Sequence, residues 1–293
     1  MKILNFGSLN IDFVYAVEEF VKPGETISSL GVTKNPGGKG FNQSVALSRA
    51  GSEVFHAGLI GEDGIFLKEL CESVGVNTQY LHVVDIPTGN AIIEVDKHGA
   101  NRIILYGGAN QMMTEKYVDD VLRNFGQGDM IVLQNEINCL PYIIEKAYEK
   151  KMQIVLNPSP MNDKITKKMM ERASIIMVNE LEAESLTGES NIEECMKKLK
   201  SLYSAAAIVM TLGKEGVWYD DGKQSIRKGI YPLKAVDTTA AGDTFTGYFL
   251  STLLKTQDVS TALDTASKAS AIAVSRKGAF PSIPVMSEVE KLV

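Results

Sequence analysis

Four short apolar runs, separated by stretches of helical character, constrain the fold of this chain most strongly. They are residues 129–134 (DMIVLQ), 153–157 (QIVLN), 174–178 (SIIMV) and 206–211 (AAIVMT). Short runs rich in β-branched residues are typical of buried strands, and helices between such strands indicate βαβ units. The pattern therefore predicts an α/β fold with a mostly parallel central sheet flanked by helices.

Length, charge and cysteine content narrow the class of protein. The 293 residues are 44% hydrophobic and contain no internal repeat or long linker, so we expect one domain spanning residues 1–293. The net charge of −6 disfavours nucleic acid or a membrane surface as a partner. Cys71, Cys139 and Cys195 lack metal-ligand spacing, and the first residues include no long apolar run. We therefore expect a soluble, cytoplasmic protein with reduced thiols.

Two segments in the N-terminal part of the chain predict a small separate sheet. Residues 12–36 have the character of short strands, and residues 88–107 contain a hairpin pattern, AIIEVD and NRIILY, around Gly99. We expect these inserts to form a β-sheet lid that covers a site and excludes water. The alternative is an edge extension that serves only dimerisation.

Residues 236–250 (VDTTAAGDTFTGYFL) predict a helix that begins beside an anion-binding turn. Apolar residues recur at helical spacing from Phe245 onward, so Gly242 and Asp243 lie in the first turn. Because Ala241 and Gly242 carry almost no side chain, a phosphate could approach the unpaired N–H groups there. Asp243 would then be a proton acceptor beside a phosphoryl group. A carboxylate that only caps the helix is equally compatible with these residue types.

Polar residues follow several of the predicted strands, where parallel strands end at one edge of the sheet. Asn10 and Asp12 follow the first strand, and the glycine-rich loop 35–43 contains Lys39 and Asn42. This loop matches neither the phosphate-binding loop nor the GxGxxG pattern, and it indicates a polyhydroxyl or phosphate site. Asn10 or Asp12 alone could equally form an Asx turn. We expect the helix after the loop to span residues 44–50.

Two further strand ends carry candidate ligand residues. Asn179 and Glu182, after the strand at 174–178, could hold a hydrated Mg²⁺ through oxygen ligands, or could simply cap the next helix. Residues 211–216 (TLGKEG) could form a tight turn beside a nucleotide, or an ordinary hairpin turn. The residue types alone leave both alternatives open.

The motifs GGKGFNQ (37–43) and DTTAAGDTFTG (237–247), in this order and separation, resemble the paired signatures of the ribokinase (PfkB) family of carbohydrate kinases. The resemblance spans almost the whole chain, and GSLNID, KPGET, LNPSP, VNELEAE and AVSRKGAFPSIP resemble the ribokinase subgroup. It implies phosphorylation of D-ribose at its 5-hydroxyl with ATP, Mg²⁺ and K⁺, and a homodimer formed through the lid. The alternatives are another sugar or nucleoside kinase of the family, such as a deoxyribokinase, or a non-catalytic sugar or nucleotide sensor.

The resemblance also implies a role for each matching residue. Asp243 would be the catalytic base, with Ala241 and Gly242 in the anion hole. The sugar would contact Asn10, Asp12, Gly38, Lys39, Gly40, Asn42, Glu136 and Asp243. The nucleotide would contact Asn179, Thr211, Gly213, Gly216 and Gly242, with Ser267 at the adenine edge. A monovalent cation would lie near Asp237, Thr239, Ala273, Arg276, Gly278 and Ser282, and Asn179 with Glu182 would be linked to Mg²⁺. Phe41 and Asn135 depart from the subgroup pattern, and either could reshape the sugar pocket.

Overall fold

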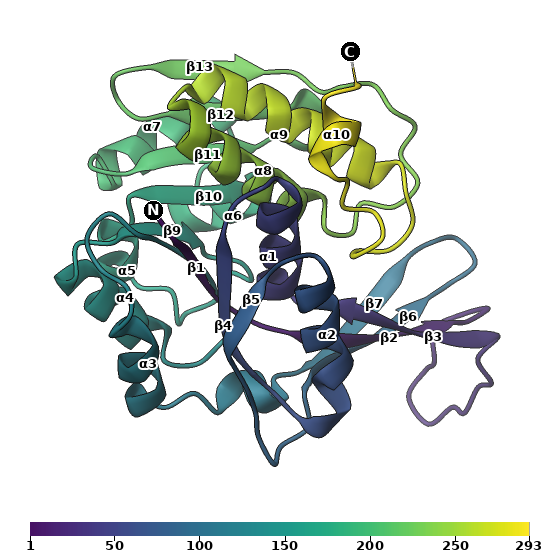
Figure 1. Ribbon diagram of the computed structural model, residues 1–293. Coiled ribbons are helices and arrows are strands. Elements are labelled where there is room, and N and C mark those ends of the chain that lie inside the picture. The colour runs from purple at the N-terminus through teal and green to yellow at the C-terminus, as the bar shows by residue number, and fades with distance from the viewer. Residues whose placement is uncertain (293) are drawn as a thin grey trace.

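The structure, a computed structural model, describes residues 1–292 and contains a nine-stranded central sheet (Figure 1). Its strands are β1 (Ile3–Phe6), β4 (Val54–Ile60), β5 (Asn77–Val83), β8 (Met130–Gln134), β9 (Gln153–Asn157), β10 (Ile175–Asn179), β11 (Ala207–Thr211), β12 (Val217–Asp220) and β13 (Ser225–Lys228). They lie in the order β13-β12-β11-β10-β9-β8-β1-β4-β5, and neighbouring strands from β11 to β5 are parallel. β12 and β13 continue the sheet in antiparallel pairing. The predicted mostly parallel sheet is confirmed.

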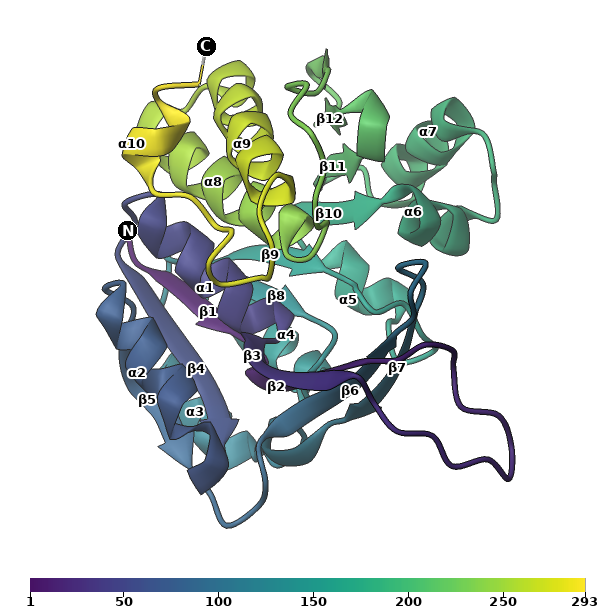
Figure 2. The same cartoon turned by 90° about the vertical axis from the view of Figure 1, so that its right-hand side faces the viewer.

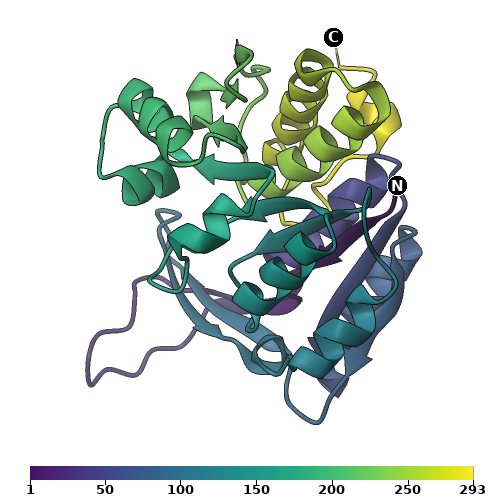
Figure 3. The same ribbon diagram turned by 90° about the vertical axis from the view of Figure 1, so that its left-hand side faces the viewer.

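Helices cover both faces of this sheet. They are α1 (Lys39–Arg49), α2 (Ile65–Ser73), α3 (Glu115–Leu122), α4 (Leu140–Glu149), α5 (Lys167–Glu171), α6 (Glu180–Thr187), α7 (Ile192–Leu202), α8 (Ala241–Thr256), α9 (Val259–Val274) and α10 (Met286–Val289). Helices α3 to α7 lie on one face, and α1, α2, α8 and α9 lie on the other (Figures 2 and 3). No helix within residues 1–292 is both long and apolar enough to cross a membrane.

The core is divided by the sheet because successive side chains of a strand point to opposite faces. On β1, Leu4 and Phe6 pack beneath α3 and α4, whereas Ile3 packs beneath α1 and α8. Asn5 shares the α1 side with Ile3 and is completely buried there. A buried polar side chain in an apolar strand requires hydrogen-bond partners, and those of Asn5 are described below.

A second, smaller sheet projects from this body as a lid (Figure 2). Its strands are β2 (Asn10–Ala16), β3 (Gly31–Gly37), β6 (Gly89–Val95) and β7 (Asn101–Tyr106), in the order β3-β2-β6-β7. β6 and β7 form the predicted antiparallel hairpin. β2 pairs with β6 in parallel, so the two inserts make one sheet although many residues separate them in sequence. The predicted lid is confirmed.

Helix α1 begins earlier than the sequence indicated. We expected a helix over residues 44–50, but it spans Lys39–Arg49, and the residues predicted to contact a ligand lie in its first turns. Gly38 precedes it with a φ of 92°, a conformation that favours glycine. A Cβ at Gly38 would also lie 2.9 Å from the backbone nitrogen of Asn10. The glycine therefore allows the start of a helix to lie directly against the segment that joins β1 to β2.

Candidate active site

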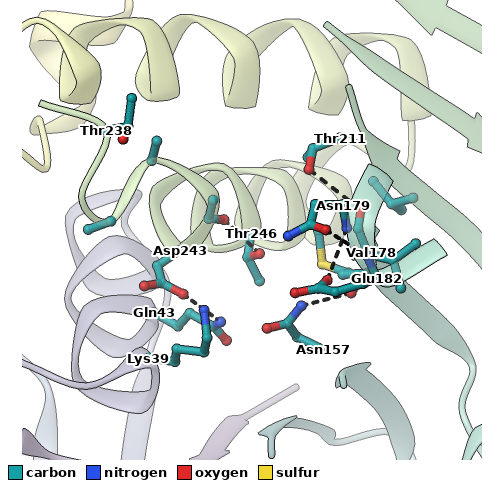
Figure 4. Close-up of a pocket in the computed structure, with 15 residues that line it drawn as sticks. Lys39, Gln43, Asn157, Val178, Asn179, Glu182, Thr211, Thr238, Asp243 and Thr246 are labelled. Carbon is teal, nitrogen blue, oxygen red and sulfur yellow. Dashed lines mark hydrogen bonds between the residues drawn. The ribbon is translucent and has the colours of Figure 1, made fainter. Parts of the chain in front are cut away.

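A cavity lies where the carboxyl ends of β9, β10 and β11 face the first turns of α1 and α8 (Figure 4). Lys39 and Asp243 lie on one side of it. Asn157 and Glu182 lie on the other. This is the edge at which open α/β sheets bind ligands. The cavity brings together the following predicted residues: Lys39, Asn179, Glu182, Thr211, Ala241, Gly242 and Asp243.

The first turn of α8 is shaped to accept an anion. Ala240 precedes the helix in the left-handed conformation, with a φ of 59°, and turns the chain sharply into Ala241 and Gly242. A Cβ added at Gly242 would meet no other atom of residues 1–292 within 4 Å, so the cavity reaches the backbone here. The N–H of Ala241 already donates to the Thr238 carbonyl at 3.2 Å, so the donor that the helix start offers the cavity is the N–H of Gly242, at the positive end of the helix dipole.

Asp243 is held in place by two amide side chains from α1. The amide of Asn42 donates to its Oδ2 at 3.0 Å, and the amide of Gln43 donates to its Oδ1 at 2.9 Å. The carboxylate is only 8% exposed and lines the cavity. No side chain caps α8, so Asp243 does not act as a helix cap, and its orientation is set by another helix. The sequence reasoning missed Gln43, although it follows Asn42 directly in the motif.

Lys39 supplies positive charge beside Asp243. Burial lowers the pKa of its ammonium, but the carboxylates of Asp243, Glu136 and Glu182 outweigh this effect and leave the pKa above its ordinary value. The ammonium therefore remains charged at neutral pH. It faces the same cavity as the first turn of α8 (Figure 4).

Glu136 connects β8 to the beginning of α1. Its Oε2 accepts hydrogen bonds from the Ser8 hydroxyl and from the backbone N–H of Lys39, the latter at 3.0 Å. The Ser8 hydroxyl also accepts a hydrogen bond from the N–H of Gly40. A Cβ at Gly40 would lie 2.5 Å from the Ser8 nitrogen, so this approach requires glycine. Ser8 is a further site residue that the sequence reasoning did not identify.

Asn10 is oriented by Asn110, which is almost completely buried. The amide of Asn110 donates to Asn10 Oδ1 at 2.8 Å and to the Leu9 carbonyl at 3.1 Å. The N–H of Leu9 donates back to Asn110 Oδ1 at 3.1 Å. The amide nitrogen of Asn10 can therefore point away from this cluster. Asn110 belongs to the Gly-Gly-Ala-Asn segment at 107–110, but nothing in that segment indicated its partner.

Asp12 lies on β2, a lid strand next to the start of α1. Burial, reinforced by the nearby charge of Glu136, raises the pKa of its carboxyl group to about 6. Gly37, which lies on the neighbouring strand β3 and pairs with Asn10, is beside Asp12, and a Cβ there would be 2.1 Å from Asp12 Oδ2. Glycine at this position therefore gives the carboxylate its room.

Asn179 and Glu182 form a capping box at the start of α6. The N–H of Glu182 donates to Asn179 Oδ1 at 2.9 Å, and the N–H of Asn179 donates to Glu182 Oε2 at 3.0 Å. The capping alternative is therefore realised, and it uses one oxygen of each side chain. No cluster of three or more His, Cys, Asp or Glu side chains suited to a metal occurs within residues 1–292. Mg²⁺ here would need most of its oxygen ligands from water and phosphate.

The predicted nucleotide residues are divided between the cavity and its surroundings. Asn179, Thr211 and Gly242 line the cavity. Gly213 and Gly216 lie in the turn between β11 and β12, with φ values of 47° and 98°. This turn is both glycine-dependent and part of a hairpin, so the two alternatives for residues 211–216 are not exclusive. Ser267 lies on α9, where it is largely buried.

The predicted cation residues converge from two segments. Asp237 Oδ1 accepts from the N–H and hydroxyl of Thr239 at 2.9 and 2.6 Å, and its Oδ2 accepts from the N–H of Gly278 at 2.8 Å. Burial alone would raise the pKa of the Asp237 carboxyl group. The three hydrogen bonds and the charge of Lys277 outweigh burial, so this pKa lies below its usual range. The Arg276 side chain is engaged with Glu288 at 2.6 Å.

The other residues predicted to hold the cation, Ser282 and Ala273, lie close to this loop. The Ser282 hydroxyl donates to the Ala279 carbonyl at 2.7 Å and is itself completely buried. Ala273 lies in the last turn of α9. The carbonyl of the next residue, Val274, accepts a hydrogen bond from the N–H of Asp237 at 3.1 Å, so the end of α9 contacts the Asp237 loop directly. The predicted set thus occupies one region beside the start of α8.

The two residues that depart from the subgroup pattern are engaged elsewhere. Phe41 is completely buried, and its ring centroid lies 5.9 Å from that of Phe280. The amide of Asn135 donates to the Pro160 carbonyl at 2.6 Å and to Asn162 Oδ1 at 3.0 Å. Neither side chain lines the cavity described above.

Comparison with known proteins identifies the family. The family described as "pfkB family carbohydrate kinase" matches residues 1–286. The chain is 36% identical over 303 residues to a ribokinase of Staphylococcus aureus, with 99% of both sequences covered. Among solved structures, a ribokinase from Thermotoga maritima has a TM-score of 0.90 at 33% identity, covering 99% of this chain and 98% of that chain. An Arabidopsis thaliana ribokinase complexed with ribose and ATP has a TM-score of 0.89 at 29% identity, covering 99% and 97%.

The chain therefore belongs to the pfkB family of carbohydrate kinases. The resemblance drawn from the two sequence motifs is confirmed.

Proposed function

We propose that this protein is a ribokinase, which transfers the γ-phosphoryl group of ATP to the 5-hydroxyl of D-ribose. The observation that carries the proposal is Asp243, a carboxylate fixed by two amides at an anion-binding helix start, within a cavity that also contains Lys39. The full-length similarity to ribokinases supports ribose as the substrate.

In this mechanism Asp243 accepts the proton of the attacking hydroxyl. Asn42 and Gln43 keep the carboxylate oxygens directed at that hydroxyl. The N–H of Gly242 and the Lys39 ammonium stabilise the charge on the transferring phosphoryl group, whereas the N–H of Ala241 is held by the Thr238 carbonyl and shapes the turn. Transfer then depends mainly on positioning and electrostatics, as is usual in phosphoryl transfer.

The sugar hydroxyls are assigned to polar side chains that meet at the lid. Asn10, Asp12 and Glu136 are carboxylates and amides with defined orientation, as described above. Sites of this kind reject analogues that leave such groups unpaired. The arrangement therefore favours a polyhydroxylated sugar over a deoxysugar.

In this proposal ATP lies across the strand ends, with its phosphates at Gly242 and its base towards Gly213, Gly216 and Ser267. Mg²⁺ bound to the phosphates would neutralise their charge during transfer. Glu182 Oε1, the carboxylate oxygen that the capping box does not use, would hold water ligands of the Mg²⁺. A potassium ion is assigned to the loop around Asp237 and Gly278. Oxygen ligands with few charges suit a large monovalent cation, and the Asp237 carboxylate keeps that loop closed.

A homodimer through the lid is also part of the proposal. Ile103, Ile104 and Leu105 on β7 are 54%, 69% and 59% exposed. An edge strand with contiguous exposed apolar residues is a surface that association would cover.

The proposal also includes a single domain that carries this lid. We also expect a cytoplasmic location, because Cys71, Cys139 and Cys195 are free thiols.

The test is ADP release with ATP, Mg²⁺ and K⁺ across ribose, deoxyribose, fructose and several nucleosides. Strong preference for ribose is the expected result. Preference for deoxyribose or a nucleoside would keep the kinase chemistry and contradict the sugar assignment. Folded protein that binds ATP but turns over none of these compounds would contradict catalysis and favour a sensor.

A further inference from the structure

A group of buried polar side chains connects Asp243 to the interior of the protein. Going inward from Asp243, they are Gln43, Gln134, Asn5, Ser44 and His56, and we refer to them as the Gln43–His56 network. They come from α1, β8, β1 and β4. Each is at most 1% exposed. Polar groups at this depth are stable only when they are hydrogen-bonded, and these side chains bond mainly to one another.

The half of the network near Asp243 is made of amides. The Gln43 amide nitrogen donates to Asp243 Oδ1 at 2.9 Å. The Gln134 amide nitrogen donates to Gln43 Oε1 at 2.7 Å and to Asn5 Oδ1 at 3.0 Å. Within residues 1–292, the hydrogen bond that fixes the orientation of Gln43 Oε1 is therefore the one donated by the Gln134 nitrogen.

The inner half ends on backbone carbonyls. The Asn5 amide nitrogen donates to the Gly40 carbonyl at 2.7 Å and to Ser44 Oγ at 2.8 Å. Ser44 Oγ and His56 Nδ1 are 2.7 Å apart, and His56 Nε2 lies 3.3 Å from the Gly7 carbonyl.

The direction of every hydrogen bond in the network follows from its obligate acceptors. The Asp243 carboxylate and the Gly40 and Gly7 carbonyls can only accept. The Gln43 amide must therefore present nitrogen to Asp243 and oxygen to Gln134, which in turn must donate to it. At the other end, His56 must donate from Nε2, so its Nδ1 accepts the Ser44 hydroxyl proton. Burial, which lowers the pKa of His56 to about 4, agrees with this neutral form.

One unpaired atom shows which function of Gln134 is used. Its Oε1 is buried and accepts no hydrogen bond within residues 1–292. Turning the amide over would give Oε1 a new environment, but it would also place oxygen against the oxygens of Gln43 and Asn5. The observed orientation therefore keeps both donated bonds at the expense of an unsatisfied acceptor. Gly7 provides the room, because a Cβ there would lie 2.4 Å from Gln134 Oε1.

We propose that the Gln43–His56 network positions the catalytic base, with Gln134, Asn5, Ser44 and His56 acting through Gln43 on the Asp243 carboxylate. This inference rests on the proposed function, because it concerns the role of Asp243 in that reaction. A glutamine side chain has several rotatable bonds, and without Gln134 its amide could turn and present oxygen to the carboxylate. Asp243 would then be held by Asn42 alone and could rotate about that bond. All four are positioning residues, since none of them touches the reacting atoms.

The principal test is Gln134→Met, which keeps side-chain length and removes the donated hydrogen bonds. Because a misplacement of about 1 Å can cost roughly 100-fold in rate, we expect kcat to fall at least roughly tenfold. We expect the dissociation constants for ribose and ATP to change by less than about twofold, since the ligand-contacting groups remain. Steady-state kinetics and calorimetric binding measure the two separately.

A matched control separates positioning from stability. Val132 lies two residues earlier on β8, so it faces the same side of the sheet, and it is equally buried in the apolar core. Val132→Ala should lower the melting temperature without lowering kcat, measured well below the melting temperatures of both variants. If Val132→Ala lowers kcat as much as Gln134→Met does, the effect belongs to general packing and the proposal is overturned.

A second pair of variants tests the far end of the network and applies even if Gln134→Met does not fold. His56→Leu removes the acceptor for the Ser44 hydroxyl, and His56→Asn retains one. We expect His56→Leu to lower kcat and His56→Asn to restore most of it, with ribose binding unchanged in both. Wild-type kcat in folded Gln134→Met, or in His56→Leu, would overturn the proposal. Failure of the proposed function would be seen differently, as wild-type protein without turnover on any sugar.

Discussion

Gly247 on α8 and Ala46 on α1 lie so close together that a Cβ at residue 247 would be 2.4 Å from the Cβ of Ala46. The same added atom would lie 2.7 Å from the backbone nitrogen of Leu47. Neither neighbour is a flexible side chain that could move away, so the two helices reach this separation only because residue 247 is glycine. Since α1 carries the amides and α8 carries Asp243, this contact sets the spacing of the active site.

Gly247→Ala should therefore impair both stability and catalysis. Overpacking of a filled core costs typically about 1–3 kcal/mol, and we expect a loss in this range together with a lower kcat. Urea denaturation and steady-state kinetics measure the two effects. Gly126→Ala is the control, because a Cβ at Gly126 would meet no other atom of residues 1–292 within 4 Å. A Gly247→Ala variant with the stability and kcat of the wild type would show that the helices can separate without consequence.

Asp243→Asn should abolish most turnover while leaving the fold and ribose binding intact. The amide is the same size as the carboxylate but cannot accept the hydroxyl proton, and positioned general bases contribute roughly 100- to 10,000-fold in rate. Single-turnover phosphorylation and calorimetric ribose titration provide the measurements. Asp221→Asn, a change in the turn between β12 and β13, serves as the control for loss of one charge. Near-wild-type turnover by Asp243→Asn would contradict its role as the base.

The residues that sequence reasoning placed correctly in the cavity are those in contiguous motifs. Gly242 and Asp243 could be assigned to a helix start because the apolar period after them fixes the helix and the small residues before them fix the turn. Lys39 was found in a glycine-rich loop, although the loop proved to be the start of α1. The boundary was misplaced because three glycines indicate a loop by propensity, whereas packing of residue 40 against Ser8 decides the conformation.

The residues that sequence reasoning missed act through partners far away in the chain. Asn5 and His56 were visible as polar residues inside apolar strands, and such residues require partners when buried. The sequence gives no means of pairing Asn5 with Gln134, because 129 positions separate them and only the β1–β8 pairing brings them together. Similarly, Asn179 and Glu182 fit both a cap and a metal site, since oxygen ligands serve either purpose.

Binding of the sugar should weaken in acid as Asp12 becomes protonated. Its carboxyl pKa is raised to about 6 by burial and by Glu136, so the carboxylate that accepts hydrogen bonds from sugar hydroxyls predominates only above that pH. With a single titrating group, kcat/KM for ribose should fall about tenfold per pH unit below 6. Asp12→Asn should bind more weakly at pH 8 and lose this part of the pH dependence. A wild-type kcat/KM that is equal at pH 7 and pH 5 would contradict the assignment.

Replacing Na⁺ by K⁺ should raise activity, and Asp237 should be required for the effect. Its carboxylate holds Thr239 and Gly278 together, and loss of those hydrogen bonds would open the loop that supplies the cation's oxygen ligands. Asp237→Asn should therefore show a smaller ratio of activity in K⁺ to activity in Na⁺. Initial rates at constant ionic strength, titrated with each chloride salt, give the measurement. Equal wild-type rates in the two salts would remove the proposed cation site.

The buried imidazole of His56 should make the folded protein less stable in mild acid. Its pKa is about 4 in the folded state, because burial disfavours the charged form, and about 6.5 when the chain is unfolded. Between these values the unfolded state binds more protons, so the free energy of unfolding rises with pH and is fully recovered above about 6.5. At pH 5 this one group should cost about 2 kcal/mol relative to neutral pH. Urea denaturation at pH 5 and at neutral pH gives the change in the free energy of unfolding for the wild type and for His56→Asn, which cannot titrate, and the difference between the two changes is the contribution of His56. Equal changes in the two proteins would show that His56 is protonated as readily when folded as when unfolded.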